Sequence, residues 1–136
     1  MDRAEVEELV QRWVRQTIVE GRLDTFHELL TRDVVDRSRS ALAMGVESFK
    51  ARAAAVGAAF ADIEVVVDAL VVEGDAIAWR WTLTGTHVGP FAGASATGRR
   101  VTLQGVNFQR LRDGRVAEHW TQIDVLGALQ ALRSTP

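Results

Sequence analysis

The stretch AIAWRWTLTGTHVGPFAGASATGRRVTLQGVNFQRL, residues 76–111, predicts two strands joined by an unusually long connection. Ile77, Trp79, Trp81 and Leu83 alternate with small or polar residues, which is the period of a strand with one buried face. Residues 85–100 then hold four glycines, one proline and three alanines. A hairpin needs far fewer residues to reverse the chain, so we expect this loop to have a further role.

The same alternation extends on both sides of this stretch. We expect strands over 63–73, 76–86, 100–111 and 115–124, separated by Glu73-Gly74-Asp75, by the long loop and by Arg112-Asp113-Gly114. Before residue 63 the hydrophobic pattern has the period of a helix. We expect an amphipathic helix from Val6 to Ile18, which ends before Gly21, and a short helix over 25–30 capped by Asp24. An alanine-rich helix should follow from about Val46 to Phe60. Helices followed by strands predict an α+β fold in one domain, residues 1–136.

Composition excludes several classes of protein. The chain has 136 residues, 47% of them hydrophobic, which is enough to bury a sizeable core. A net charge of -2 with interspersed signs does not suit a nucleic-acid or anionic-membrane partner. The start MDRAEVEELV is acidic, unlike a signal peptide, and no apolar run approaches a membrane span, so we expect a soluble, cytoplasmic protein. Without cysteine there are no disulfides, thiolate nucleophiles or sulfur metal ligands.

The turn at Asp113-Gly114 allows two registers of the last two strands. A two-residue turn places Leu111 opposite Val116 and Asn107 beside Trp120. A three-residue turn with a left-handed glycine places Asn107 opposite His119. In that second register the residues sharing the face of Asn107 are Leu103, Gly105, Thr121 and Ile123, and Asp124 points the other way.

Three segments and their order resemble a known family. GVESFKARAAAVGAAFADIEV, GTHVGPFAGASATGRRV and FQRLRDGRVAEHWTQID, followed by a leucine-rich helix, are similar to the SnoaL-like polyketide cyclases of the NTF2-like superfamily. The resemblance implies a cystatin-like cone, in which helices pack on a strongly curved antiparallel sheet around one apolar pocket. It also implies that the glycine- and alanine-rich loop lies at the pocket mouth, with Phe91 as its apolar contact.

The resemblance also implies a type of reaction. These cyclases close a ring by intramolecular aldol condensation without metal or cofactor. Such chemistry requires a base that removes a proton next to a carbonyl, and a hydrogen-bond donor for the oxyanion that develops. A carboxylate suits the first role if burial raises its pKa, and asparagine or histidine suits the second.

This chain departs from the family at the catalytic positions. The catalytic aspartate on the family's last strand aligns with Thr121 of this chain. The family's histidine on the preceding strand aligns with Asn107, and the glutamine two residues before that histidine aligns with Gly105. An asparagine of the family's early loop aligns with Asp36. Threonine at an ordinary pKa cannot be the base. The aligned positions share one face only with the three-residue turn, so we adopt that register.

Our hypothesis makes Asp36 the general base or proton shuttle, with Asn107 and His119 donating hydrogen bonds to a substrate carbonyl. In the alternative interpretation Asp36 pairs with Arg37, Arg39 or another surface arginine, and His119 is a hydrogen-bonded sheet residue. The residues expected to line the pocket are Trp13, Thr17, Trp79, Trp81, Phe91, Gly105, Thr121 and Ile123.

Other polar residues are weaker candidates. His27 and His87 are expected to be solvated or at the rim, and with no HxH, HExxH or phosphate-loop pattern we predict neither metal nor nucleotide cofactor. Asp62 and Asp124 are as consistent with structural roles as with catalysis. Asp62 suits capping at a strand edge, and Asp124 suits the N-terminus of the last helix. Arg80 is expected in an ion pair on the sheet surface.

Three functions remain open. The first is cyclisation or isomerisation of a hydrophobic, polyketide-like small molecule. The second is epoxide opening on the same fold, which would require two carboxylates with an arginine between them. The third is a binding protein without catalysis. A sheet covered by helices on one side also predicts a homodimer through its bare apolar face, formed by Val106, Phe108, Val116 and Trp120.

Overall fold

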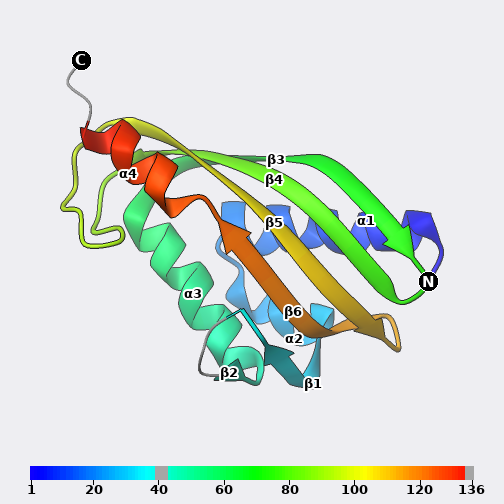
Figure 1. Cartoon of the computed structure of the whole chain (residues 1–136). Helices are drawn as coiled ribbons and strands as arrows, with labels where there is room; N and C mark the ends of the chain where they lie inside the picture. Colours follow the sequence, from blue (N-terminus) through cyan, green and yellow to red (C-terminus); the bar gives the residue numbers. More distant parts are fainter. Residues whose placement is uncertain (39–42, 134–136) are drawn as a thin grey trace.

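The computed structural model describes residues 1–38 and 43–133. Helices come first in the chain and are followed by long strands, with a last helix at the end (Figure 1). The helical elements are α1 (Arg3–Arg12), the π-helical η1 (Trp13–Val19), the 3-10 helix η2 (Leu23–Thr25), α2 (Phe26–Leu29), α3 (Val46–Ala59) and α4 (Val125–Arg133). The strands are β1 (Leu30–Asp36), β2 (Ala43–Met44), β3 (Phe60–Glu73), β4 (Ala76–His87), β5 (Arg100–Arg112) and β6 (Arg115–Ile123).

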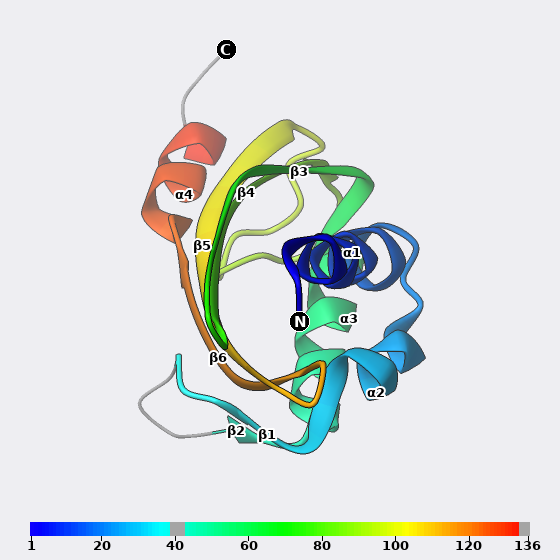
Figure 2. The same ribbon diagram turned by 90° about the vertical axis from the view of Figure 1, so that its right-hand side faces the viewer.

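One curved sheet organises the molecule. Its strand order is β2-β1-β6-β5-β4-β3. All pairs are antiparallel except β1 with β6. Figure 2 shows the sheet curling around α1, α2 and α3, which lie on its concave side. The predicted α+β cone is therefore confirmed.

The predicted helices agree with the structure apart from local differences. The alanine-rich helix is α3. The first helix begins at Arg3, three residues before the predicted start, and it continues from Trp13 as a π-helix, where the Glu20 amide donates to the Arg15 carbonyl. The predicted cap at Asp24 is wrong. Asp24 lies inside η2, and its carboxylate forms an ion pair with Lys50 at 2.9 Å.

The four predicted strands are β3 to β6, and the prediction missed β1 and β2. Residues 30–36, LTRDVVD, mix charged and apolar side chains without a clean alternation, and β1 is formed by its parallel pairing with β6. Asp36 therefore ends a strand beside His119 rather than lying in a loop. This parallel pairing connects segments 83 residues apart in sequence, which a local pattern does not reveal.

The β5–β6 hairpin follows neither predicted register along its whole length. The turn is the two-residue one, with Arg112 opposite Arg115 and Leu111 opposite Val116. A bulge at Ala117 then adds one residue, so Asn107 pairs with Thr121. The resulting pairing differs from the predicted three-residue register by two residues. Because side chains of a strand alternate with period two, the same residues still point to the same face of the sheet. The adopted pairing was wrong, but its assignment of faces was right.

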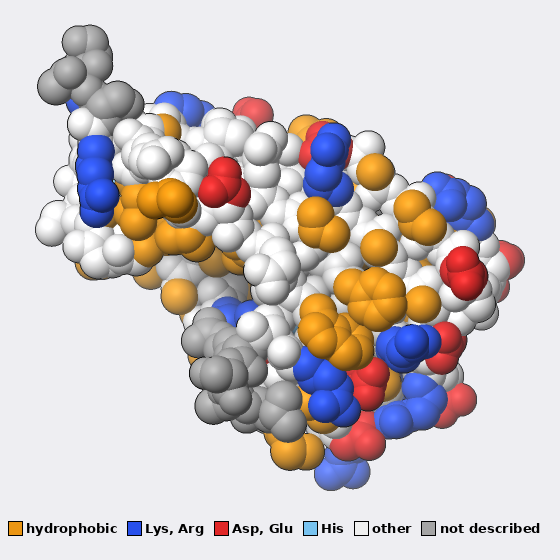
Figure 3. Space-filling view, viewed as in Figure 1, with side chains coloured by type: hydrophobic (Ala, Val, Ile, Leu, Met, Phe, Trp, Pro, Cys, Tyr) orange, Lys and Arg blue, Asp and Glu red, His pale blue; other side chains and the backbone are white. Residues whose placement is uncertain are grey.

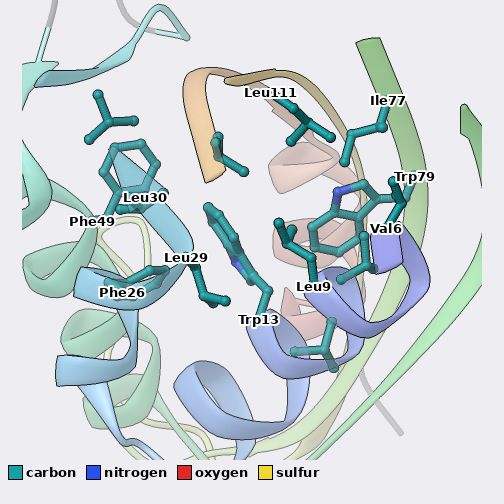
Figure 4. Close-up of a cluster of buried hydrophobic side chains, with 14 of the residues drawn as sticks. Val6, Leu9, Trp13, Phe26, Leu29, Leu30, Phe49, Ile77, Trp79 and Leu111 are labelled. Carbon is teal, nitrogen blue, oxygen red and sulfur yellow. The ribbon is translucent and has the colours of Figure 1, made fainter. Parts of the chain in front are cut away.

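Trp13 is the centre of the main core (Figure 4). Its ring lies between two groups of side chains, with Phe26 and Phe49 on one side and Trp79 on the other. The centroid distances from Trp13 are 5.1 Å to Phe26, 6.0 Å to Phe49 and 6.2 Å to Trp79, all in edge-to-face geometry. Such pairs each add about 0.5–1.5 kcal/mol beyond area burial. The first helical segment is therefore fixed to both α3 and the sheet.

The convex face of the sheet is largely polar, with an apolar patch (Figure 3). Val106 is 44% and Phe108 38% exposed, and Phe108 packs edge-on to Trp120 at 5.3 Å. Arg80 forms the expected surface ion pair, with Asp68 at 3.9 Å. The prediction that Val116 lies on this face is wrong, because Val116 precedes the bulge and is fully buried in the core. Among the described residues, no helix has the length and apolar character that crossing a membrane requires.

Candidate active site

A cavity of about 530 Å³ lies between the concave face of the sheet, η1 and α3. Its walls are mostly aromatic and aliphatic, and its polar side chains are few. The polar residues that line it are Ser38, Arg52, Asn107, His119 and Thr121. A smaller hollow of about 360 Å³ is lined mainly by polar and charged side chains, among them Asp68, Arg80 and Gln122, and it has no aromatic enclosure of the kind that surrounds the larger cavity. The larger cavity is therefore the candidate site.

Most predicted wall residues line this cavity. Those that do are Trp13, Trp79, Trp81, Phe91, Thr121 and Ile123. Thr17 and Gly105 do not, which corrects the prediction. Thr17 is buried and its hydroxyl donates to the Trp13 carbonyl, inside the π-helix. A Cβ at Gly105 would lie 2.3 Å from the indole of Trp81, so Gly105 makes room for that ring without lining the cavity.

The long loop between β4 and β5 forms part of the cavity wall, through Pro90, Phe91 and Ala92. Its position at the mouth stays a prediction. The ring of Phe91 contacts Phe60 at 5.2 Å. At the base of the loop the amides of Val88 and Gly89 donate to the Ala59 carbonyl at the end of α3. The loop is thus anchored to the same helix that forms the opposite wall.

His87 lies where this loop begins, at the end of β4. The prediction that His87 is solvated or at the rim is wrong, because the side chain is fully buried. Its Nδ1 lies 3.1 Å from the Thr97 hydroxyl and accepts from the Thr97 amide at 3.3 Å. His27, by contrast, is exposed as expected, with its Nε2 3.5 Å from Lys50 Nζ.

Asn107 has an orientation that its neighbours determine. The indole of Trp81 can only donate, and it donates to Asn107 Oδ1 at 3.1 Å. The Thr121 hydroxyl donates to the same oxygen at 2.7 Å. With Oδ1 occupied twice, the Nδ2 protons are the group that Asn107 can offer to a ligand.

His119 is oriented by a chain of buried hydrogen bonds. Trp79 Nε1 donates to Gln109 Oε1 at 3.1 Å, which places the Gln109 amide nitrogen toward His119 Nδ1 at 3.0 Å. Because an amide nitrogen only donates, Nδ1 is the acceptor and the ring proton of the neutral imidazole lies on Nε2. His119 is therefore a second donor, and this tautomer presents no ring lone pair that could accept a proton from substrate.

The surroundings of His119 keep it neutral. Burial above all, and then the positive charge of Arg52, lower its pKa to about 4, against the smaller opposite effect of Asp36. The ring of Trp13 stacks on the imidazole at 5.5 Å with an interplanar angle of 15°, and Phe49 packs edge-on at 5.2 Å. These rings exclude water from His119 and fix the plane of its imidazole.

Asp36 lies behind the cavity wall rather than in it. The side chain is fully buried, its Oδ2 is 2.6 Å from Arg52 Nη2, and its Oδ1 accepts from the Ser38 amide at 2.9 Å. Burial raises the pKa of Asp36, but the hydrogen bonds from Ser38 and the charge of Arg52 outweigh it and hold the pKa below its ordinary value. A general base needs the opposite shift, so this environment does not support the predicted base role.

The alternative pairing of Asp36 is also only partly right. Its partner is Arg52, which lines the cavity, while Arg37 pairs with Glu118 at 3.1 Å. Arg39 lies outside the described residues.

Arg52 and Gln109 belong to the site but were not among the residues predicted from the sequence. Arg52 lies in an alanine-rich helix that also carries Glu47 and Lys50, and charged residues of such a helix usually mark its solvated face. Its spacing of three from Phe49 was the available signal, because residues three apart share one side of a helix. Gln109 alternates with Asn107 on the inward face of β5 and is fully buried. A buried glutamine requires partners, and this requirement could have indicated the link to His119.

The other two candidate aspartates, Asp62 and Asp124, lie outside the cavity lining. Asp124 Oδ1 accepts from the Gly127 amide at 2.8 Å, which confirms that it opens α4. Asp62 lies at an irregularity of β3 with φ 50°, away from the cavity-lining residues. Within residues 1–38 and 43–133, no group of three or more carboxylate or histidine side chains is arranged to hold a metal ion.

A curved, mostly antiparallel sheet wrapped around helices, with an aromatic cavity between them, defines the NTF2-like class of α+β proteins. Residues 8–132 match the family described as SnoaL-like polyketide cyclase. The chain belongs to this SnoaL-like family. A comparison with curated protein sequences gave no match.

Solved structures agree with this assignment. TsrD from Streptomyces laurentii is 30% identical, with a TM-score of 0.90 and 99% of each chain covered. An inferred SnoaL-like polyketide cyclase from Jannaschia sp. CCS1 is 29% identical, with a TM-score of 0.85 over 100% of this chain and 99% of the other. IdmH, an inferred polyketide cyclase from Streptomyces antibioticus, is 28% identical, with a TM-score of 0.80 over 94% of this chain and 98% of the other.

Proposed function

We propose that this protein is a cofactor-independent enzyme that cyclises or isomerises a hydrophobic, polyketide-like substrate through an enolate. The observation that carries the proposal is the pair of oriented donors, Asn107 Nδ2 and His119 Nε2, in a cavity with apolar walls. Donors fixed before the reaction stabilise an oxyanion more strongly in such a cavity than in water. The family and its neighbours support a cyclase, and the residue roles are our inference.

The proposed reaction begins with loss of a proton next to a ketone. The carbon–hydrogen bond breaks, and its electron pair moves onto the carbonyl oxygen, which accepts hydrogen bonds from Asn107 and His119. In a cyclisation the α-carbon then attacks a second carbonyl of the same molecule and forms the carbon–carbon bond. The new alkoxide takes up a proton. In an isomerisation the proton returns to another carbon instead.

Asp36 contributes to this reaction by holding Arg52. Its carboxylate fixes one side of the guanidinium at 2.6 Å, and the positive charge of Arg52 lies in the cavity wall. Asp36 is thus proposed as a positioning residue. The proton acceptor is then solvent at the cavity mouth, which suits substrates whose α-protons are already acidic, such as β-dicarbonyl compounds.

Epoxide opening fits the site less well. The arginine that this reaction would require is present as Arg52, with Asp36 on one side of it. Asp36 itself lies behind the wall, and the described residues that line the cavity include no carboxylate.

Exchange of α-protons in D2O tests the proposal without the natural substrate. An aryl β-keto ester serves as probe, and NMR follows deuterium incorporation at the carbon between the two carbonyls. We expect the wild-type protein to accelerate exchange, and the double variant Asn107→Leu with His119→Leu to lose about 10²–10³-fold of that acceleration. Asp36→Asn is expected to reduce it less, because Asn can still hold Arg52 through its amide oxygen.

Asp68→Asn is the matched control for Asp36→Asn, since Asp68 pairs with Arg80 on the convex face. Circular dichroism and thermal unfolding establish that each variant is folded. Exchange that is no faster with wild-type protein than in buffer, although the probe binds, would favour the binding protein without catalysis. A complete loss in Asp36→Asn with Arg52→Gln still active would restore Asp36 as the base.

A further inference from the structure

We propose that the polar end of the cavity binds an acidic hydroxyl, a phenol or enol on a planar aromatic ligand, in its ionised form. This inference rests on the proposed function and names the class of ligand for the same site. It concerns the bound ground state, in which the anion persists, rather than an oxyanion that forms transiently.

The first support is that the oriented polar groups of the cavity donate. The oxygen of Asn107 is occupied by Trp81 and Thr121, and the oxygen of Gln109 by Trp79. Both tryptophan N–H groups are used in these bonds. The side-chain hydrogens left for a ligand are those of Asn107 Nδ2, His119 Nε2 and the Ser38 hydroxyl, whose oxygen accepts from the Thr121 amide at 2.7 Å. The Thr121 oxygen can still accept, but donors are in the majority, so a ligand oxygen that only accepts is favoured over one that has to donate.

Charge is the second support. Arg52 is the one charged residue among the described cavity-lining residues, and its side chain is 28% exposed. Asp36 holds the guanidinium from outside the wall, so the pair presents its positive end to the cavity. A negative oxygen is favoured there, and an ammonium group is not.

The third support is the shape of the surroundings. The parallel stack of Trp13 on His119 sets flat faces beside the donors, and Trp81 and Phe91 supply further aromatic wall. Flat rings pack against such walls by stacking or edge contacts. A delocalised phenolate or enolate carries its charge on such a ring and is less costly to bury than a compact, strongly hydrated anion.

Ionisation in the site is balanced by release of one proton to solvent. The O–H bond of the ligand breaks, its electron pair stays on the oxygen, and the proton passes to bulk water. His119 does not take it, because the ring accepts at Nδ1 from Gln109 and already carries a proton on Nε2.

The test uses 4-nitrophenol and its O-methyl ether, 4-nitroanisole, as matched probes. Nitrophenol changes colour on ionisation, so absorbance reports the state of the bound molecule, and quenching of tryptophan fluorescence reports binding of both probes. At a pH below the pKa of the free phenol, we expect the bound phenol to show the phenolate band and to bind at least about tenfold more tightly than the ether. Arg52→Gln is expected to shift the ionisation midpoint of bound nitrophenol upward, and Arg80→Gln, the same change on the convex face, to leave it unchanged.

The outcomes separate this inference from the proposed function. Bound nitrophenol that stays neutral, or an ether that binds as tightly as the phenol, would overturn the inference while leaving the cavity as a binding site. If neither probe binds to folded protein, the inference fails together with the idea of an aromatic ligand. An Arg52→Gln variant that unfolds is replaced by Arg52→Lys, which keeps the charge and should keep the phenolate band.

Discussion

At the scale of single residues, the Gln109 side chain determines what His119 can do. Its amide donates to His119 Nδ1 at 3.0 Å because Trp79 occupies its oxygen. We predict that Gln109→Glu moves the neutral ring proton from Nε2 to Nδ1 and raises the pKa of His119 above about 4, since a carboxylate accepts and favours the imidazolium. Long-range ¹H–¹⁵N correlation spectra of the imidazole measure both changes.

Gln104→Glu is the control for this variant, because Gln104 is exposed on the opposite face of β5. It should leave the imidazole signals of His119 where they are. Wild-type spectra showing a proton on Nδ1 at neutral pH would contradict the assigned orientation of Gln109 and with it the two-donor site.

The neutral state of His119 also has a consequence for stability. Its pKa is lowered from 6.5 to about 4 in the folded protein, so between these values the unfolded chain binds a proton that the folded chain does not. The free energy of unfolding is therefore expected to fall as pH decreases from about 6.5 to about 4. The pKa shift of His119 alone corresponds to a loss on the order of 3 kcal/mol in the free energy of unfolding.

Urea unfolding at several pH values, compared between wild type and His119→Gln, isolates this contribution. The variant should lose less stability across the interval, whatever its stability at neutral pH. His27→Gln removes an exposed histidine and should follow the wild-type curve. Parallel curves for wild type and His119→Gln would mean that His119 is not held neutral.

At the scale of elements, the long antiparallel strands could be predicted because each carries its own alternation. The face shared by Asn107, His119 and Thr121 was predicted only through the family resemblance, because the two-residue turn without a bulge would have placed Trp120 beside Asn107. The bulge at Ala117 was not predictable, because one unpaired residue leaves no local pattern. Neither was β1, whose position is set by parallel pairing with β6. The Arg52–Asp36 ion pair forms because β1 and α3 lie next to each other, so it could not be predicted from the sequence either.

The last helix, α4, provides a prediction at this scale. Asp124 caps its first turn through the Gly127 amide, and the next residue, Val125, lines the cavity. Asp124→Ala should therefore destabilise α4 by about 1 kcal/mol, whereas Asp124→Asn should cost little, because asparagine caps equally well. Hydrogen exchange at the amides of Gly127 and Ala128 is the direct measurement. Equal exchange in both variants would show that α4 is held by packing of Ala128 and Leu132 alone.

For the whole molecule, the distribution of apolar side chains separates two faces of one sheet. The helices α1 and α3 lie against the concave face (Figure 2). The cavity is lined by residues of this face together with residues of η1 and α3. On the convex face a patch formed by Val106, Phe108 and Trp120 remains open to solvent (Figure 3). None of these three residues lines the cavity. Association through this patch would leave both ligand sites accessible.

We propose that two copies of the chain meet through this patch. Around a twofold axis the same patch of both copies is buried, so Val106→Glu would bury an unpaired carboxylate from each copy in the contact and is expected to convert a dimer into a monomer. Sedimentation velocity at micromolar concentration measures the change. Val19→Glu is the matched control, since Val19 has the same exposure of 44% but lies at the end of η1 on the helical side of the molecule. Wild-type protein that sediments as a monomer would refute the dimer, and equal dissociation by both variants would place the contact elsewhere. Neither result would affect the cavity, because none of the three patch residues lines it.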